Sequence, residues 1–335
     1  MPKNYFHAIT LPALLLGLLT LGGCASTEVS LSEFNRDAPL REASRLPTEA
    51  DLNRQGRAKV VVFEAEDSNL DKARRAQAAT TLTRAVEDML GANGAEVIDR
   101  SVATKLGQEL QLAEVKGVGG YDGPALANFA VKPSITAAEY TSRFVPASSF
   151  TDKNGKVYNT PASYSHNANV NISLRIYEIP SLRPIKTVNG RGTNSNSTSD
   201  RGANDLPVTM IRNATRSALG DVRADFLNLF APKGYVLSKR ENKGKSIFRI
   251  SIGSVQGIVS GNKVVIYSEQ ESINPITKKS SYDKIPVVEG TVSNIVTPSE
   301  AWVVPSDEDK AKHVRLGDQI EVVHKDSAWT KMFRP

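Results

Sequence analysis

The side chains best suited to acid–base chemistry stand together after a run of β-branched residues. Glu64, Glu66 and Asp67 follow residues 59–63, the kind of position at which α/β enzymes place catalytic carboxylates. Acidic residues are also common where a strand simply ends in solvent, and this second interpretation is the one we favour. No metal-ligand spacing connects the four histidines, which are His7, His166, His313 and His324.

Two sequence patterns that mark catalytic or phosphate-binding sites are missing. The sequence has no Gly-x-Ser-x-Gly nucleophile elbow, so it does not predict a serine hydrolase. The glycine-rich residues 117–120 are not followed by the Lys-Ser/Thr pair of a phosphate-binding loop, and we expect an ordinary turn there. The sequence therefore predicts no catalytic residue, metal, cofactor or small-molecule substrate, and we do not expect an enzyme.

The one cysteine, Cys24, is the remaining residue with distinctive chemistry. It follows a basic residue, Lys3, an apolar run over residues 9–21 and two glycines, which is the order of an exported signal peptide. The apolar run is shorter than the about 20 residues that span a bilayer. An ordinary signal peptide, cleaved near Ala25 to leave a free thiol, is one interpretation of this order.

Residues 21–24, Leu-Gly-Gly-Cys, also resemble the bacterial lipobox, in which the thiol is acylated and becomes the first residue of the mature protein. The resemblance implies a lipoprotein signal peptide over residues 1–23, lipidation of Cys24 with palmitate-type chains, and attachment to a membrane through that lipid. Two or more acyl chains on one residue give stable anchoring. Ala25 after the cysteine implies sorting to the outer membrane, facing the periplasm.

The rest of the chain has a globular composition. Hydrophobic residues make up 40% and charged residues 23% of the sequence, and about 310 mature residues suggest two domains and a linker. The net charge of +6 is spread without a run of like charges, so we expect no nucleic-acid partner. Residues 24–57 are polar and contain Pro39 and Pro47, which predicts a polar linker with a short helix from Thr48.

Residues 58–231 alternate strand and helix patterns, which predicts an α/β domain. Short strands are predicted at 59–63 and 95–98, with an alanine-rich helix over 70–94 between them that ends at Gly91 or Gly94. A second helix is expected to begin with Ser101 as its N-cap. The remaining elements are predicted at 127–145, 165–179 and 183–193 as strands and at 206–230 as a helix.

From residue 234 onward short strands are separated by turn residues, which predicts a small all-β, SH3-like barrel over 234–335. Gly253, Gly257 and Gly261 are expected at its corners, where a positive φ or a close backbone approach requires glycine. The six strands are predicted at 235–240, 246–253, 262–268, 286–296, 300–305 and 318–324.

The first of these domains resembles the periplasmic domain of the CsgG family of secretion lipoproteins. The similarity rests on the lipobox, on KVVVFEAED before the alanine-rich helix, on VIDRS and on VNISLRIYEIPSLRPIKTVNGRGTNSNS, and it covers residues 58–231. It implies an anticodon-binding-domain-like α/β sandwich and a homo-oligomer.

Channel-forming members of that family build a membrane pore from two long amphipathic hairpins in each subunit. The corresponding segments here, residues 150–163 and 194–205, are mostly polar, and only Phe150, Val157 and Tyr158 are large and apolar. A membrane strand needs about 9–11 residues with alternating apolar positions. We therefore expect no pore, and the resemblance points to non-channel relatives, the PelC-like ring or adaptor lipoproteins and the LpoB-type activators of cell-wall synthases.

The C-terminal part resembles the last domain of FlgT, a flagellar ring protein, through YVLSKRENKGKSIFRISIGSVQGIVSGNKVVIY and HVRLGDQIEVV. Together the resemblances imply a non-enzymatic ring or adaptor component of a secretion or flagellar envelope machine. The alternatives are a regulator of a cell-wall synthase and a curli-type exporter subunit. We expect assembly through the loops Phe150–Ser163 and Asn194–Asn204 and through the barrel, with Ala76 and Arg84 as candidate residues of a subunit face.

Overall fold

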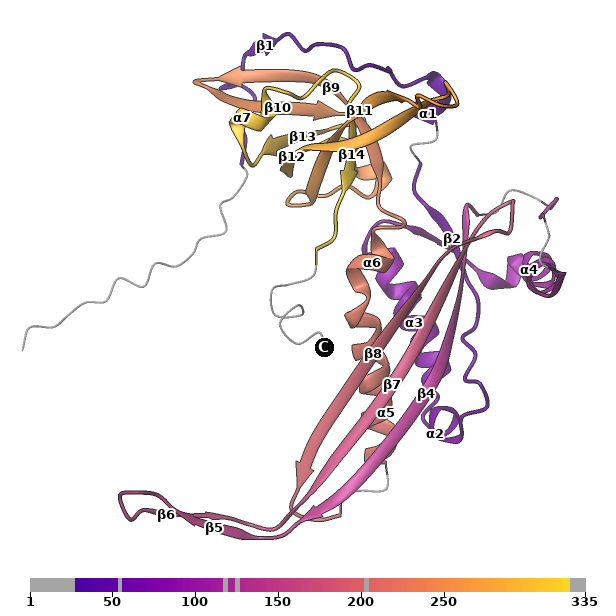
Figure 1. Ribbon diagram of the computed structural model, residues 1–335, viewed down its shortest axis with the longest axis vertical. Helices are drawn as coiled ribbons and strands as arrows, with labels where there is room; N and C mark the ends of the chain where they lie inside the picture. The colour runs from indigo at the N-terminus through magenta and orange to yellow at the C-terminus, as the bar shows by residue number, and fades with distance from the viewer. Residues whose placement is uncertain (1–27, 54–55, 117–119, 124–126, 202–204, 326–335) are drawn as a thin grey trace, which may run out of the picture.

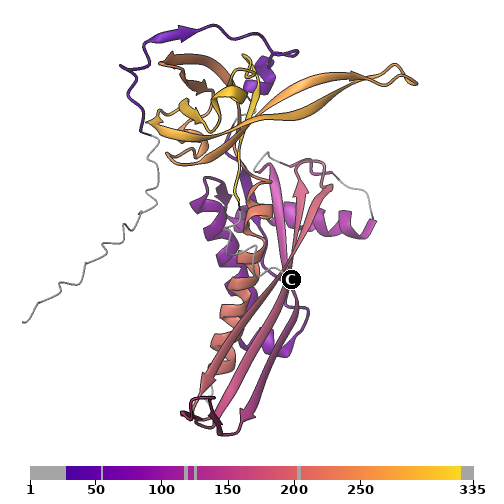
Figure 2. The same cartoon turned by 60° about the vertical axis from the view of Figure 1, so that its left-hand side comes forward.

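The computed structural model describes residues 28–53, 56–116, 120–123, 127–201 and 205–325, which form two bodies (Figures 1 and 2). A five-stranded mixed sheet with helices forms the α/β body, and six strands of a seven-stranded antiparallel sheet close into the barrel. The cysteine and the predicted signal peptide lie outside the described residues.

The sheet of the α/β body runs in the order β3-β2-β4-β7-β8. The short strand β2 pairs in parallel with β3 and β4, whereas β4, β7 and β8 form an antiparallel meander. The bounds are Lys59–Val62 for β2, Glu96–Ile98 for β3, Phe129–Val145 for β4, Ser163–Glu178 for β7 and Pro184–Thr198 for β8. The long strands β4, β7 and β8 continue well beyond β2 and β3, so only these three form the far end of the sheet (Figure 1).

Helices cover the two faces of this sheet unequally. One face packs the main core against helices that include α3 (Ala78–Ala92) and α5 (Leu206–Asp221), where buried residues such as Leu82 and Met210 meet Ile172. Among the described residues, the other face is covered only near β2, by α4 (Thr104–Lys116). The remaining short elements are α2 (Asp71–Arg75), the 3-10 turn η1 (Arg100–Ala103) and α6 (Arg223–Leu227).

Four sequence predictions in this body need correction. The helix predicted over 206–230 is two helices, α5 and α6, because the backbone leaves the helical conformation at Val222 (φ −107°, ψ 9°). The helix predicted over 70–94 is two helices, α2 and α3, because Gln77 takes a left-handed conformation with φ of 50° between them. Ser101 is not an N-cap but lies inside η1, the 3-10 turn that leads into α4; Asp99 caps η1, and its carboxylate accepts from the Ser101 backbone N–H. Ala76 is completely buried in the core, so its prediction as a subunit-face residue is wrong, whereas Arg84 is exposed.

Helix α5 lies directly on strand β8 because two glycines leave room for its backbone. A Cβ at Gly190 would lie 2.2 Å from the Ala218 carbonyl oxygen, and one at Gly192 would lie 2.0 Å from the Ala214 carbonyl oxygen. Contacts this short exclude any side chain without movement of the helix. The two glycines therefore set the distance between helix and strand.

All six predicted strands of the C-terminal region are present, and β9 pairs with β14 to close the barrel. Gly257 and Gly261 have positive φ, whereas Gly253 is extended but so close to Thr297 that a Cβ would lie 2.2 Å from its carbonyl oxygen. The bounds are Lys233–Asn242 for β9, Lys245–Ile250 for β10, Lys263–Ile273 for β11, Ser280–Val296 for β12, Ala301–Pro305 for β13 and Gln319–Val322 for β14, with α7 at Glu308–Ala311 and the turn η2 at Ser254–Gln256.

Part of the predicted polar linker is folded against the barrel. Strand β1 (Arg36–Ala38) pairs with β9, and Val29 and Phe34 are buried beside Ile247 and Trp302. The expected short helix is α1 (Glu49–Asn53), and the Thr48 hydroxyl accepts from the Asp51 backbone N–H at its start. Burial of two apolar side chains in an otherwise polar segment explains why composition alone predicts a linker here.

Candidate functional site

A cleft of about 350 Å³ opens between α4 and the strands β2 and β4. The residues just after β2 form one wall and the exposed side of α4 forms the other. Gly107 allows α4 to approach the Phe63 ring at the cleft, because a Cβ at position 107 would lie 3.1 Å from that ring. Its lining residues are Phe63, Glu64, Glu66, Arg100, Thr104, Gly107, Gln108, Leu110, Gln111, Glu114 and Lys132.

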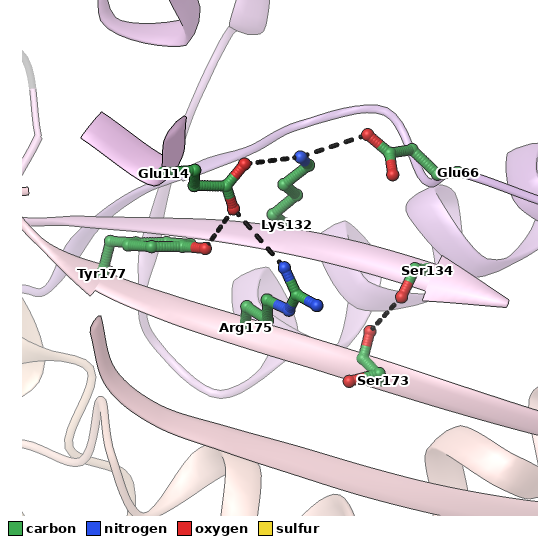
Figure 3. A network of polar contacts seen from close by, with 7 residues as sticks. All are labelled: Glu66, Glu114, Lys132, Ser134, Ser173, Arg175 and Tyr177. Atoms are coloured by element: carbon green, nitrogen blue, oxygen red, sulfur yellow. Dashed lines mark hydrogen bonds and ion pairs between the residues drawn. The ribbon is translucent and has the colours of Figure 1, made fainter. Parts of the chain in front are cut away.

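A polar network forms one side of this cleft (Figure 3). Lys132 on β4 places its Nζ 2.9 Å from Glu114 Oε2 on α4 and 3.1 Å from Glu66 Oε1 after β2. Arg175 on β7 lies opposite Lys132 in the sheet, and its Nη1 is 3.6 Å from Glu114 Oε1. The Tyr177 hydroxyl donates to the same carboxylate. Three segments of chain are thus joined through Glu114.

The network holds fixed charges at neutral pH. Burial works to raise the pKa of the Glu114 carboxyl, but hydrogen bonds from Tyr177 and Lys132 outweigh it, so that pKa lies below its usual value. Burial likewise works to lower the pKa of Lys132, and its two carboxylate partners raise it overall. Burial and the Glu114 carboxylate raise the pKa of Tyr177 to about 12. The site therefore presents an ionised carboxylate, an ammonium group and a phenol that donates, an arrangement suited to polar binding.

The three carboxylates predicted from the sequence take different positions. Glu66 joins the network and Glu64 lines the cleft, whereas Asp67 is not among the lining residues and its Oδ2 lies 4.0 Å from the Arg74 Nε. Sequence reasoning missed the other four members of the network. Charged residues within otherwise apolar strands, as Lys132 and Arg175 are, were the available signal.

The described histidines are dispersed. His166 is buried between the hydroxyls of Tyr140 and Thr198, each 2.8 Å from a ring nitrogen. Burial lowers the pKa of His324, and His313 is exposed. Among the described residues no three His, Cys, Asp or Glu side chains come together as metal ligands. His7, Cys24 and Ala25 lie outside them, as do residues 117–119 of the glycine-rich turn.

The first predicted assembly loop is a projecting ribbon, which we define as residues 141–167. Strands β5 (Ser148–Thr151) and β6 (Val157–Thr160) continue the register of β4 and β7 around a turn at Gly155, whose φ is 80°. The ribbon reaches far beyond the helices (Figure 1). The turn contains the pair Asn154-Gly155, a residue pair typical of tight hairpin turns.

One face of the ribbon carries aromatic side chains. Phe150 and Tyr158 are cross-strand partners, and they are 66% and 48% exposed. Phe144 and Tyr164 are partners further along the same face, with ring centroids 5.2 Å apart. Side chains two, four or six residues apart in a strand share a face. The ribbon therefore presents an exposed aromatic row to its surroundings.

The second predicted loop is largely a strand. Residues 194–198 extend β8 alongside β7, with Asn194 opposite Ala168 and Thr198 opposite Tyr164, whereas residues 202–204 lie outside the described chain. No described strand pairs with the outer edge of β8. The Asp221 carboxylate accepts from the Arg191 backbone N–H at that edge, 3.2 Å away. Polar side chains such as these discourage further strand pairing near the helix.

No described helix is both long enough and apolar enough to cross a membrane. No protein-family model matches this chain, and no curated protein matches it in sequence. Known structures do resemble parts of it. A dodecamer of a PelC variant from Paraburkholderia phytofirmans is 13% identical, covers 53% of this chain and 96% of its own, and has a TM-score of 0.23.

A second PelC dodecamer from the same organism is 14% identical over 54% of this chain and 96% of that one, with a TM-score of 0.22. The lipoprotein GNA1162 from Neisseria meningitidis is 10% identical over 46% of this chain and 91% of that one, with a TM-score of 0.21. Because these TM-scores are low, we take no residue role and no assembly state from these proteins.

Proposed function

We propose that this chain is a lipid-anchored, non-enzymatic component of the bacterial outer membrane that faces the periplasm and assembles with copies of itself. Its role is that of a ring or adaptor in a secretion or flagellar envelope machine. The observation that carries the proposal is the projecting ribbon, with its exposed aromatic row and, in β5 and β6, two edges that pair with no other described strand. The lipobox at Cys24 supports the anchor.

A two-stranded ribbon is marginally stable in water unless another surface covers it. Every residue from Thr141 to Thr151 is exposed, and the aromatic side chains lie on one face of the ribbon. Exposed apolar rows of this kind mark interaction surfaces. Docking on a neighbouring copy would bury the row and pair the free edges.

The geometry of the ribbon favours a closed assembly. Its two edges belong to different strands, β5 on one side and β6 on the other. A subunit that offers one edge to a neighbour on its left and the other to a neighbour on its right makes head-to-tail contacts. Such contacts close into a ring when the rotation between subunits is suitable.

The test is the mass of the lipidated protein in detergent, measured by mass photometry, together with electron microscopy of the same sample. We expect a uniform oligomer, and we expect Phe150→Ser combined with Tyr158→Ser to reduce it to monomers. The matched control is Ile276→Ser in the turn between β11 and β12 of the barrel. The Ile276 side chain is 89% exposed, and its substitution should leave the oligomer intact.

A wild-type protein that stays monomeric at all concentrations and binds a cell-wall synthase would overturn the assembly proposal. In that case the regulator interpretation would replace it. If Ile276→Ser lost the oligomer while the ribbon variant kept it, the assembly surface would lie on the barrel and not on the ribbon.

A further inference from the structure

The described chain begins on the outer wall of the barrel. The Val29 backbone N–H donates to Asn294 Oδ1 over 2.7 Å, and the Val29 side chain is only 7% exposed. It shares a small apolar cluster with Phe34, Ile247 and Trp302. The first described residues are therefore fixed to the barrel.

Only four peptide steps separate Cys24 from Glu28. An extended chain spans at most about 3.6 Å per residue, so Glu28 lies within about 14 Å of the Cys24 backbone. A lipid on Cys24 would hold this side of the barrel next to the membrane surface. The polar linker predicted over residues 24–57 therefore does not separate the lipid from the barrel by its full length, because its described part is packed on the barrel from Glu28 onward.

The turn between β9 and β10 lies on the same side. Ile247, which packs against the Val29 segment, is two residues from Lys245, and side chains two apart on a strand share a face about 7 Å apart. In both views the indigo start of the described chain and the β9–β10 turn lie on one side of the barrel, and the hairpin of β11 and β12 projects from the other (Figures 1 and 2).

The hairpin of β9 and β10 is the most basic stretch of the barrel. Between residues 233 and 250 there are six lysines and arginines and one acid, Glu241. Neighbouring acids already have partners: Glu241 lies 2.6 Å from Lys239, and Asp37 lies 3.1 Å from Arg240. Lys243 and Lys245 flank the turn and are exposed, and neither forms an ion pair with another described residue. Their charges are available to a partner.

We propose that the β9–β10 turn, through Lys243 and Lys245, docks on anionic phospholipid headgroups of the leaflet that holds the lipid anchor. This rests on lipidation of Cys24 in the function proposed above. Lysine ammonium groups bind phosphate as point charges, and their attraction to an anionic surface acts within a Debye length of about 8 Å. The short tether keeps the turn at that surface, and the β11–β12 hairpin points away from it.

The experiment uses the lipidated full chain in vesicles of phosphatidylcholine, with or without phosphatidylglycerol. Because Cys24 is the only cysteine and is acylated, a single added cysteine can carry a nitroxide. One label is placed by Asn242→Cys beside the β9–β10 turn, and the other by Thr277→Cys in the opposite hairpin. Accessibility to oxygen and to a water-soluble nickel complex reports how close each label lies to the bilayer.

We expect the label at 242 to lie at the headgroups when phosphatidylglycerol is present, and the label at 277 to remain in water. Lys243→Gln with Lys245→Gln should lower the ratio of docked to undocked protein roughly 30-fold, the effect of two basic residues at an anionic surface. The matched control, Lys278→Gln with Lys279→Gln, should leave it unchanged. Lys243 and Lys278 both occupy positive-φ turn positions, with φ of 47° and 54°.

A label at 242 that stays in water in a chain still anchored to the vesicle would overturn the docking proposal alone. A membrane-bound label at 277 would do the same. Mass spectrometry of the residue 24 peptide separates these results from failure of the anchor: an unmodified thiol there would remove the lipidation on which both proposals depend.

Discussion

Gly192 lies on the face of β8 that α5 covers, and replacing it with alanine tests how closely helix and strand pack. A Cβ at this position would lie 2.0 Å from the Ala214 carbonyl oxygen and 2.3 Å from the Ala218 nitrogen. Both atoms belong to the helix backbone, so no side chain can rotate away. To reach an ordinary contact of 3.4 Å, the helix must move by roughly 1.4 Å (3.4 minus 2.0).

Two effects of opposite sign compete in Gly192→Ala. Alanine restricts the unfolded chain, which favours the folded state by about 0.5–1 kcal/mol when the site accepts it. Overpacking against rigid surroundings costs about 1–3 kcal/mol, and a backbone-to-backbone clash belongs at the upper end. We therefore expect a net loss of about 2 kcal/mol in the free energy of unfolding.

The assay is native-state hydrogen exchange of the α5 amides, which reports on the α/β body separately from the barrel. The control is Gly91→Ala near the end of α3, where a Cβ meets no atom within 4 Å and should stabilise the helix by up to about 1 kcal/mol. Exchange from α5 that is unchanged or slower in Gly192→Ala would refute this account of the helix–strand contact.

Three further predictions follow from the anchor, the ribbon and the polar network. Cys24→Ser should abolish palmitate labelling and leave unprocessed or soluble protein; labelling that persists would exclude the lipobox interpretation. Purified protein should show no conductance in planar bilayers, because the segments at 150–163 and 194–205 lack apolar alternation; stable, uniform channels would favour the exporter alternative. The pKa of Glu114 lies below its usual value in the folded state, so its ionised form stabilises the fold above the unfolded pKa, and this contribution disappears as the pH falls through the folded one. Stability at neutral pH should therefore fall in Glu114→Gln and its acid dependence should flatten, and equal acid dependence in the two proteins would contradict this.

The barrel strands were predictable because each has a local hydrophobic pattern and turn residues at both ends. The end of β8 was not. Its residues Asn194–Thr198 have no apolar period, and they are extended because β7 offers a continuous ladder of partners from Ala168 to Tyr164. Strand formation there depends on pairing across the sheet, which propensity does not record.

The polar network shows the same limit. Glu66 was predictable as an acid at a strand end, but the other members of the network come from a helix and two other strands. Lys132 and Arg175 are neighbours only because the register of β4 and β7 places them opposite each other. Nothing in the local sequence encodes that register, which is set by the long-range match of apolar faces.

The contact between the two bodies joins two glycines that the sequence predicts for unrelated local reasons, Gly94 as a helix end and Gly257 as a barrel corner. Both have positive φ, of 90° and 84°. A Cβ on Gly94 would lie 2.8 Å from the Gly257 Cα, and one on Gly257 would lie 2.6 Å from the Gly94 Cα. Each glycine is therefore required twice, by its own backbone conformation and by the facing chain. Because Arg57 also donates to the Ser254 carbonyl beside this contact, 3.3 Å away, the barrel that holds the first described residues is tied directly to the body that carries the ribbon. A barrel held at the membrane by Cys24 would thereby present the ribbon in a defined direction, as a ring of identical subunits requires.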